Sequence, residues 1–245
     1  MRTARHVLGL LFVLPLATAC ALSQTAVCPA KSAPHPATQT DLVELVRVIP
    51  DLVLDIRYAT PNNFTGKAVY PSARCFLAKE PALALRDVQA ELKTLGYGLK
   101  VFDGYRPLSV QRKFWAILPD PRYVADPKKG SRHNRGYAVD VSLVDLNGHE
   151  VQMPTDFDDF SERAHPDYTH LSAETINHRD LLKTVMERHG FTQFPTEWWH
   201  FDYRGWENKP VLDIPIDRLE MSHSSRTFDS PKGREKERGG RKRRP

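Results

Sequence analysis

The sequence predicts an α+β fold, because strand-like and helical segments follow one another in no regular order and no segment repeats. The chain has 245 residues, which is enough for one domain with a hydrophobic core. Its content of 40% hydrophobic and 27% charged residues is ordinary for a globular protein. These observations favour a single α+β domain over a parallel α/β or repeat architecture.

The N-terminal segment, residues 1–20, is predicted to be a secretion signal. Arg2 and Arg5 give it a positive start, and 7–19 is an apolar run too short to span a membrane. Small residues precede Cys20, so cleavage near this point is expected, and lipidation of Cys20 remains an alternative. No later apolar run reaches membrane length. We therefore expect a mature chain without a membrane span, in the periplasm or otherwise secreted into the bacterial envelope.

Two further segments are predicted to lie outside the folded domain, which is expected at 41–221. Residues 21–40 are rich in Pro, Ala, Ser and Thr and are expected to form a linker. Residues 222–245 hold nine Lys/Arg and three Asp/Glu and few apolar residues, which predicts a disordered basic tail. The tail could contact anionic envelope polymers or be dispensable. The rest of the chain has 26 Lys/Arg against 27 Asp/Glu, so no nucleic-acid partner is expected.

The first half of the domain has three recognisable elements. An apolar segment opens at 42–48, and a strand is expected at 52–56. A helix is expected at 81–95, because apolar residues recur at helical spacing and Gly96 can end it in a left-handed conformation. Pro81 suits the first helical position. The expected apolar face consists of Leu85, Val88, Leu92 and Leu95.

Five more elements follow. Strands are expected at 99–102, 138–144 and 198–203, and helices at 109–118 and between 172 and 190. Ser172 is a plausible N-cap of the last helix, and Gly190 is expected to end it. Its expected apolar stripe consists of Ile176, Leu182, Val185 and Met186.

Two short segments, 131–140 and 197–200, carry residues suited to a hydrolytic metal site. Such a site needs three protein ligands and an open position for water, and two histidines with one carboxylate are a common set. His133, Asp140 and His200 can provide it. The site also needs a base outside the coordination shell, for which Glu197 is the candidate.

The spacing of these residues constrains their geometry. In a strand at 138–144, Asp140 shares the polar face, while Val139, Val141 and Leu143 share the other face. Glu197 and His200 are three residues apart, so a regular strand would point them to opposite sides. Both can approach one metal if Glu197 lies on the loop before the strand or if a bulge intervenes.

Other chemistries find little support. No Cys-x-x-Cys is present, and His149-Glu150 lacks a second histidine at helical spacing. No nucleophile elbow or phosphate-binding loop occurs. Cys28 and Cys75 would be an even pair in an oxidising compartment, so a disulfide between them and two unpaired thiols both remain open.

Taken together, the motifs resemble the VanX-like D-alanyl-D-alanine dipeptidases, zinc peptidases with the hedgehog/D,D-peptidase fold. The resemblance covers about residues 51–206 and rests on six segments in the same order, namely 55–60, 63–66, 103–107, 131–140, 157–158 and 197–200. It implies a single domain with a central antiparallel sheet flanked by helices. The activity it implies is hydrolysis of D-Ala-D-Ala to two D-alanines in the cell envelope.

The resemblance also implies roles for individual residues. One zinc ion per chain would be held by His133, Asp140 and His200, with Glu197 as general base and acid, and Arg106 would stabilise the oxyanion. The substrate pocket would be lined by Tyr58, Ser131 and Asp158, with Asp158 near the ammonium of the dipeptide.

Alternatives remain at this stage. Arg106 could instead form a structural salt bridge with Asp103, and Asp158 is one of several acids at 156–159. The rival functions are a D,D-carboxypeptidase that trims peptidoglycan stem peptides and a non-enzymatic wall-binding module. An intact set of ligands with a base favours an enzyme, since a binding module needs no base beside its metal.

Overall fold

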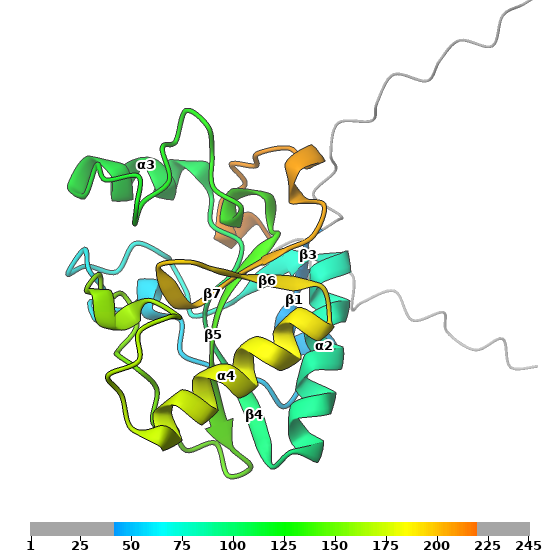
Figure 1. The fold of residues 1–245 in the computed structure, drawn as a ribbon. Helices are drawn as coiled ribbons and strands as arrows, with labels where there is room; N and C mark the ends of the chain where they lie inside the picture. Colours follow the sequence, from blue (N-terminus) through cyan, green and yellow to red (C-terminus); the bar gives the residue numbers. More distant parts are fainter. Residues whose placement is uncertain (1–41, 220–245) are drawn as a thin grey trace, which may run out of the picture. The chain divides into compact units, whose positions relative to one another are not determined.

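The computed structural model describes residues 42–219, which are built around a five-stranded sheet (Figure 1). Its strands, in spatial order, are β2 (Val53–Leu54), β4 (Tyr97–Asp103), β5 (Ala138–Asp145), β7 (Glu197–Tyr203) and β6 (Phe191–Phe194). Neighbouring strands are antiparallel, except that β2 pairs with β4 in parallel. The predicted α+β class with a central antiparallel sheet is confirmed, and the parallel edge strand is an addition to it.

A second, two-stranded sheet is formed by β1 (Leu42–Glu44) and β3 (Phe76–Ala78), and a short helix, α1 (Leu45–Val48), follows β1 directly. The sequence predicted neither strand. Each has only three residues, and all three residues of β3 are buried, so the alternation of apolar and polar residues that reveals a half-exposed strand is missing.

The first long helix, α2 (Lys79–Thr94), begins two residues before Pro81. Pro81 therefore lies in the first turn, where a backbone N–H has no partner inside the helix. Leu95 was wrongly placed on the apolar face. The helix ends before it, and Leu95 is 47% exposed. Gly96 adopts a φ of 91°, so the predicted left-handed end is confirmed.

The other two long helices are α3 (Leu108–Ile117) and α4 (Ala173–Arg188). Ser172 caps α4 as predicted, since its side chain accepts a hydrogen bond from the Thr175 N–H. The buried stripe of α4 includes Thr175 and His178, whereas Ile176, predicted to be in the stripe, is only half-buried. Figure 1 shows α2 and α4 side by side along the sheet, with α3 apart from them.

Four short 3₁₀ helices lie in the connections, namely η1 (Arg57–Ala59), η2 (His133–Arg135), η3 (Glu162–Ala164) and η4 (Trp206–Asn208). Gly136 directly follows η2 and has a φ of 68°. A Cβ added there would lie 2.9 Å from the Ala78 backbone nitrogen and 2.7 Å from a Leu42 methyl carbon. Only glycine allows this close approach, which fixes the turn carrying His133 against the small sheet.

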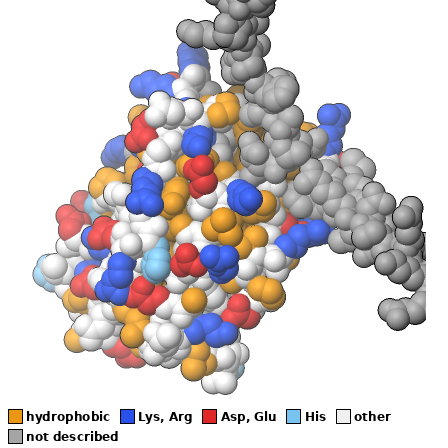
Figure 2. Space-filling view, turned by 90° about the vertical axis from the view of Figure 1, so that its right-hand side faces the viewer, with side chains coloured by type: hydrophobic (Ala, Val, Ile, Leu, Met, Phe, Trp, Pro, Cys, Tyr) orange, Lys and Arg blue, Asp and Glu red, His pale blue; other side chains and the backbone are white. Residues whose placement is uncertain are grey.

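Charged side chains of both signs are interspersed on the face shown in Figure 2. This agrees with the near balance of charge outside the basic tail. Within residues 42–219 no helix is both long and apolar enough to cross a membrane.

Several predictions concern residues outside 42–219. The signal at 1–20 with Cys20, the linker at 21–40 and the tail at 222–245 all lie outside the described residues, so these assignments stay predictions. Cys75 is buried, but Cys28 also lies outside the described residues, and the proposed disulfide therefore stays a prediction as well.

Candidate active site

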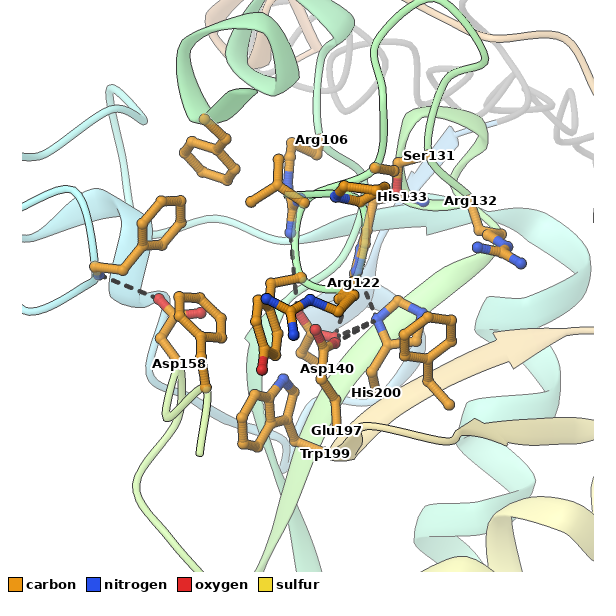
Figure 3. Close-up of a pocket in the computed structure, with 18 of the residues that line it drawn as sticks. Arg106, Arg122, Ser131, Arg132, His133, Asp140, Asp158, Glu197, Trp199 and His200 are labelled. Atoms are coloured by element: carbon orange, nitrogen blue, oxygen red, sulfur yellow. Dashed lines mark hydrogen bonds and ion pairs between the residues drawn. The ribbon is translucent and has the colours of Figure 1, made fainter. Parts of the chain in front are cut away.

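Three buried side chains from different parts of the chain meet at one point beside the central sheet. His133 comes from η2, and Asp140 on β5 lies directly opposite His200 on β7 in the strand pairing. His133 Nε2 is 3.1 Å from His200 Nδ1, and Asp140 Oδ1 is 3.0 Å from His200 Nδ1 and 3.4 Å from His133 Nε2 (Figure 3). Tetrahedral zinc with ligands at 2.0–2.1 Å separates its donor atoms by about 3.3 Å. The three donors therefore fit one zinc ion.

The remaining nitrogen of each histidine has its own acceptor. His133 Nδ1 lies 2.7 Å from the Gly104 carbonyl oxygen, and His200 Nε2 lies 2.9 Å from Asp202 Oδ1. When these nitrogens carry the protons and donate, the lone pairs of the other two nitrogens face the metal position, as is usual for metal-binding histidines. Sequence reasoning missed Asp202. The signal was its position two residues after His200, which puts both side chains on one face of the strand.

The charges in the centre favour a cation. Burial acts to raise the pKa of Asp140, but its contacts with His133 and His200 hold that pKa well below its usual value. Burial acts to lower the pKa of His200, whereas Asp202 and Asp140 hold it well above its usual value. Each group thus prefers its charged form next to an opposite charge, and a divalent metal ion can take the place of the histidine protons.

Glu197 lies beside this centre without belonging to the closest group of donor atoms. Its Oε2 is 3.7 Å from His200 Nδ1. The pairing of β6 with β7 shifts register between Gln193 and Phe194, and this irregularity lets Glu197 and His200 face the same side although they are three residues apart. Burial raises the pKa of Glu197 to about 8. A carboxyl group with such a pKa can both accept and return a proton near neutral pH.

Arg106 is buried at the edge of the centre and is held in place on both sides of its guanidinium. Nε and Nη2 donate to Asp103 Oδ2 at 3.0 and 2.8 Å, and Nη1 donates to Gln111 Oε1 at 2.9 Å. Nη2 also lies 4.0 Å from Asp140 Oδ2. The salt bridge with Asp103 therefore exists, and it aims a fixed cation at the pocket that Arg106 lines.

Asp158 lies at the far side of the same pocket from the histidines (Figure 3). The Tyr58 hydroxyl donates to its Oδ1 at 3.0 Å, and the Phe64 N–H donates to its Oδ2 at 3.3 Å. Within residues 42–219 no cationic side chain forms an ion pair with it. Burial raises the pKa of Asp158 to about 7, against the effect of both hydrogen bonds.

The backbone of Asp158 is also unusual. Its φ of 63° is the only positive value at a non-glycine residue among residues 42–219. Backbone held in this sparsely populated region persists where the surroundings enforce it, and such residues cluster in functional sites. This backbone conformation sets the direction in which the Asp158 side chain leaves the chain, and the hydrogen bonds from Tyr58 and the Phe64 N–H hold its carboxylate.

Ser131 and a set of aromatic residues complete the lining. The Ser131 hydroxyl accepts a hydrogen bond from the His133 N–H at 3.2 Å, so it also braces the turn that carries this histidine. The structure thus brings all the predicted site residues to one pocket. Sequence reasoning missed much of the aromatic wall, which includes Phe64, Phe114, Tyr123, Phe160 and Phe194.

The two raised pKa values predict how the stability of the metal-free protein depends on pH. The pKa values of Asp158 and Glu197 rise from 3.8 and 4.5 to about 7 and about 8, so between these limits the folded state binds more protons than the unfolded state. Stability of the metal-free protein should therefore fall as pH rises. Zinc binding strengthens over the same range because its ligands lose protons.

We expect the difference in Tm between zinc-loaded and metal-free protein to widen by several degrees from about pH 5.5 to about pH 8. Thermal unfolding with zinc or with a chelator measures this difference, and the Asp158→Asn/Glu197→Gln double variant should show less dependence on pH. If the Tm difference between the zinc-loaded and the metal-free native protein stays constant or narrows as pH rises, the raised pKa values of Asp158 and Glu197 are contradicted.

Comparison with known proteins gives a consistent picture. The profile of the family described as D-ala-D-ala dipeptidase matches residues 38–216. A D-alanyl-D-alanine dipeptidase of Escherichia coli is 38% identical over 173 residues, which cover 71% of this chain and 90% of that protein. One from Enterococcus faecalis is 36% identical over 168 residues, covering 60% of this chain and 83% of that protein.

The likeness to solved structures is weaker. A crystal structure of the vancomycin resistance D,D-dipeptidase VanXYg in complex with a D-Ala-D-Ala phosphinate analogue is 18% identical, with a TM-score of 0.36, and covers 75% of this chain and 70% of that one. The family assignment therefore rests on the sequence relatives.

Proposed function

The chain belongs to the D-ala-D-ala dipeptidase family of zinc peptidases, and from that premise we propose that it hydrolyses the free dipeptide D-Ala-D-Ala to two molecules of D-alanine. One observation carries the choice of a free dipeptide. Asp158 offers a carboxylate that has no cationic partner among residues 42–219, at the side of the pocket opposite the metal ligands. Asp158 is half-buried, and a charge partly withdrawn from water in this way is costly unless a ligand supplies the opposite charge. The ammonium group of a dipeptide does so.

The metal ligands are proposed to be His133, Asp140 and His200, with one zinc ion per chain. A bound zinc ion would act there as a Lewis acid, which lowers the pKa of water and polarises the peptide carbonyl. Glu197 takes the proton of the attacking water and delivers it to the leaving amine. Its burial in the pocket and its position beside His200 suit this exchange.

Arg106 is proposed to stabilise the negative charge that develops on the carbonyl oxygen. Asp103 and Gln111 already hold its guanidinium, so little reorganisation is needed when that charge appears. Tyr58 orients the Asp158 carboxylate by a hydrogen bond, and Ser131 lines the pocket next to His133. Substrate would thus be held by its ammonium group at one side of the pocket and by its reacting carbonyl at the other side.

We also propose that the enzyme works in the bacterial envelope, where cell-wall fragments carrying D-alanine occur. The support is the apolar segment at 7–19 with its positive start. Lipid attachment at Cys20 is an alternative to plain cleavage and would place the same active site at the membrane surface.

The decisive experiment measures D-alanine release from D-Ala-D-Ala by the purified protein, with and without a chelator. We expect activity that the chelator abolishes and added zinc restores. Release at equal rates with and without zinc would contradict the metal mechanism. Absence of release from a zinc-loaded protein would contradict the dipeptidase proposal and leave a D,D-carboxypeptidase or a wall-binding module.

The ligand assignment is tested separately by metal content. His133→Ala, Asp140→Ala and His200→Ala should each bind zinc much more weakly, because each removes one of three protein donors. Elemental analysis after dialysis should find about one zinc per chain in the native protein and little in the variants. A triple variant that still holds a full zinc ion would show that the metal lies elsewhere.

A further inference from the structure

Arg132 lies where the two histidine-bearing segments of the site come together. Its backbone immediately precedes His133, whereas its side chain reaches β7, where Nε lies 3.3 Å from Asp202 Oδ2. The other oxygen of Asp202 accepts from His200 Nε2 at 2.9 Å. A chain of contacts therefore runs from the turn of one metal ligand through Arg132 and Asp202 to the other ligand.

Aromatic rings hold the guanidinium of Arg132 in this position. Its Cζ lies 4.5 Å from the centre of the Trp206 ring and 5.6 Å from that of the Phe194 ring. The Phe194 ring also meets the His200 ring edge-on, with the centres 5.2 Å apart. Figure 3 shows Arg132 beside His200, on the side away from Asp158. Arginine stacked on rings is restricted to few orientations, so its charge stays directed at Asp202.

The pairing is important for both partners. The Nε atom of Arg132 is buried and makes no hydrogen bond, and Asp202 is the carboxylate with which it forms an ion pair among residues 42–219. Asp202, in turn, has one oxygen engaged by His200 and the other facing Arg132. A carboxylate held at both oxygens cannot rotate away from the histidine that it orients.

We propose that Arg132 is a positioning residue that ties the turn of His133 to the strand of His200 through Asp202, and that it thereby sets the affinity for zinc. This inference rests on the metal site in the proposed function. The contacts of the Arg132 side chain are with Asp202, Trp206 and Phe194, so its effect on the metal site passes through Asp202. Groups that orient metal-binding histidines typically change metal affinity by about 10- to 100-fold when they are replaced.

A double-mutant cycle tests the proposal, with the dissociation constant for zinc measured by competition with a chelator. Arg132→Gln and Asp202→Asn should each weaken zinc binding by roughly 10- to 100-fold. The double variant should bind zinc about as weakly as Asp202→Asn alone, because both changes break the same chain of contacts. Arg132→Lys should recover part of the affinity, since it restores the charge without the planar group.

Arg204→Gln is the matched control. Arg204 directly follows β7, the strand that carries His200 and Asp202, and its guanidinium lies over the ring of Tyr203. Within residues 42–219 it forms no ion pair. The zinc affinity of the Arg204→Gln variant should stay within about a factor of two of the native value, which is well below the effect expected for an orienting group. The Tm of metal-free Arg132→Gln shows whether folding is intact, and a poorly folded variant leaves Arg132→Lys and Asp202→Asn to decide.

The outcomes separate this proposal from the proposed function. If the native protein binds zinc and His200→Ala abolishes binding, the metal site is correct. Under that condition, unchanged affinity in Arg132→Gln, or additive effects in the double variant, would overturn the positioning role. If His200→Ala leaves zinc affinity unchanged, the metal site itself is wrong.

Discussion

Replacement of Glu197 by glutamine should leave zinc bound and lower turnover by roughly 100- to 10,000-fold, the usual contribution of a general acid-base residue. Glu197 is buried, and its carboxylate lies 3.7 Å from His200 Nδ1, outside the closest group of donor atoms. Glutamine keeps the size of the side chain and cannot take up a proton. The change therefore removes proton transfer while the three ligands remain.

Zinc content and kcat of the same preparation measure the two effects. Glu174→Gln is a suitable control, because Glu174 is an exposed glutamate in the first turn of α4. It should match the native protein in both measurements. If kcat of the Glu197→Gln protein stays within about a factor of two of the native value, Glu197 is not the general base, because loss of a general base usually lowers the rate far more. Loss of zinc in this variant would instead make Glu197 a ligand.

The metal-site residues could be predicted from the sequence because the residue types that bind a metal lie in two short segments, 131–140 and 197–200. The alternation along β5 places Asp140 on the face opposite Val139 and Val141. The three-residue spacing of Glu197 and His200 shows that a loop or a bulge is needed before both can approach one metal. The direct pairing of Asp140 with His200 could not be predicted from this, because the register of two strands sixty residues apart is set by packing of the whole sheet.

The misplaced residues show where local patterns fail. Leu95 continues the apolar period of α2, but the turn at Gly96 ends the helix before Leu95 can face the core. Ile176 was predicted to lie on the buried face of α4 because it is hydrophobic, whereas the buried face includes the polar residues Thr175 and His178. The contact of Arg132 with Asp202 joins residues seventy positions apart, so no sequence period indicates it.

Substrate choice should show a second large effect. We expect D-Ala-D-Ala to be cleaved well, and N-acetyl-D-Ala-D-Ala and stem pentapeptides to be cleaved on the order of 100-fold less efficiently or worse, as when a buried charged group loses its partner. The Asp158 carboxylate is fixed by Tyr58 and by the Phe64 N–H, and no cation of the described domain pairs with it. An acylated substrate would bring no charge to it and would add bulk beside these aromatic residues.

Values of kcat/KM on the three substrates test this directly. Comparable values for the free dipeptide and the pentapeptide would contradict the dipeptidase proposal and favour a D,D-carboxypeptidase. L-Ala-L-Ala should also be a poor substrate, because inversion of both centres exchanges methyl group and hydrogen against the walls of the pocket.

Asp158→Asn links this selectivity to one residue. Asparagine keeps the size of the side chain but removes its negative charge, so kcat/KM should fall far more for the free dipeptide than for the acetylated one. Asp156→Asn is the matched control, because Asp156 belongs to the same acidic segment and is exposed. If Asp156→Asn lowered the preference for the free dipeptide and Asp158→Asn did not, the ammonium site would have been assigned to the wrong carboxylate. If neither changed the preference, recognition of the ammonium group would have to come from another part of the pocket.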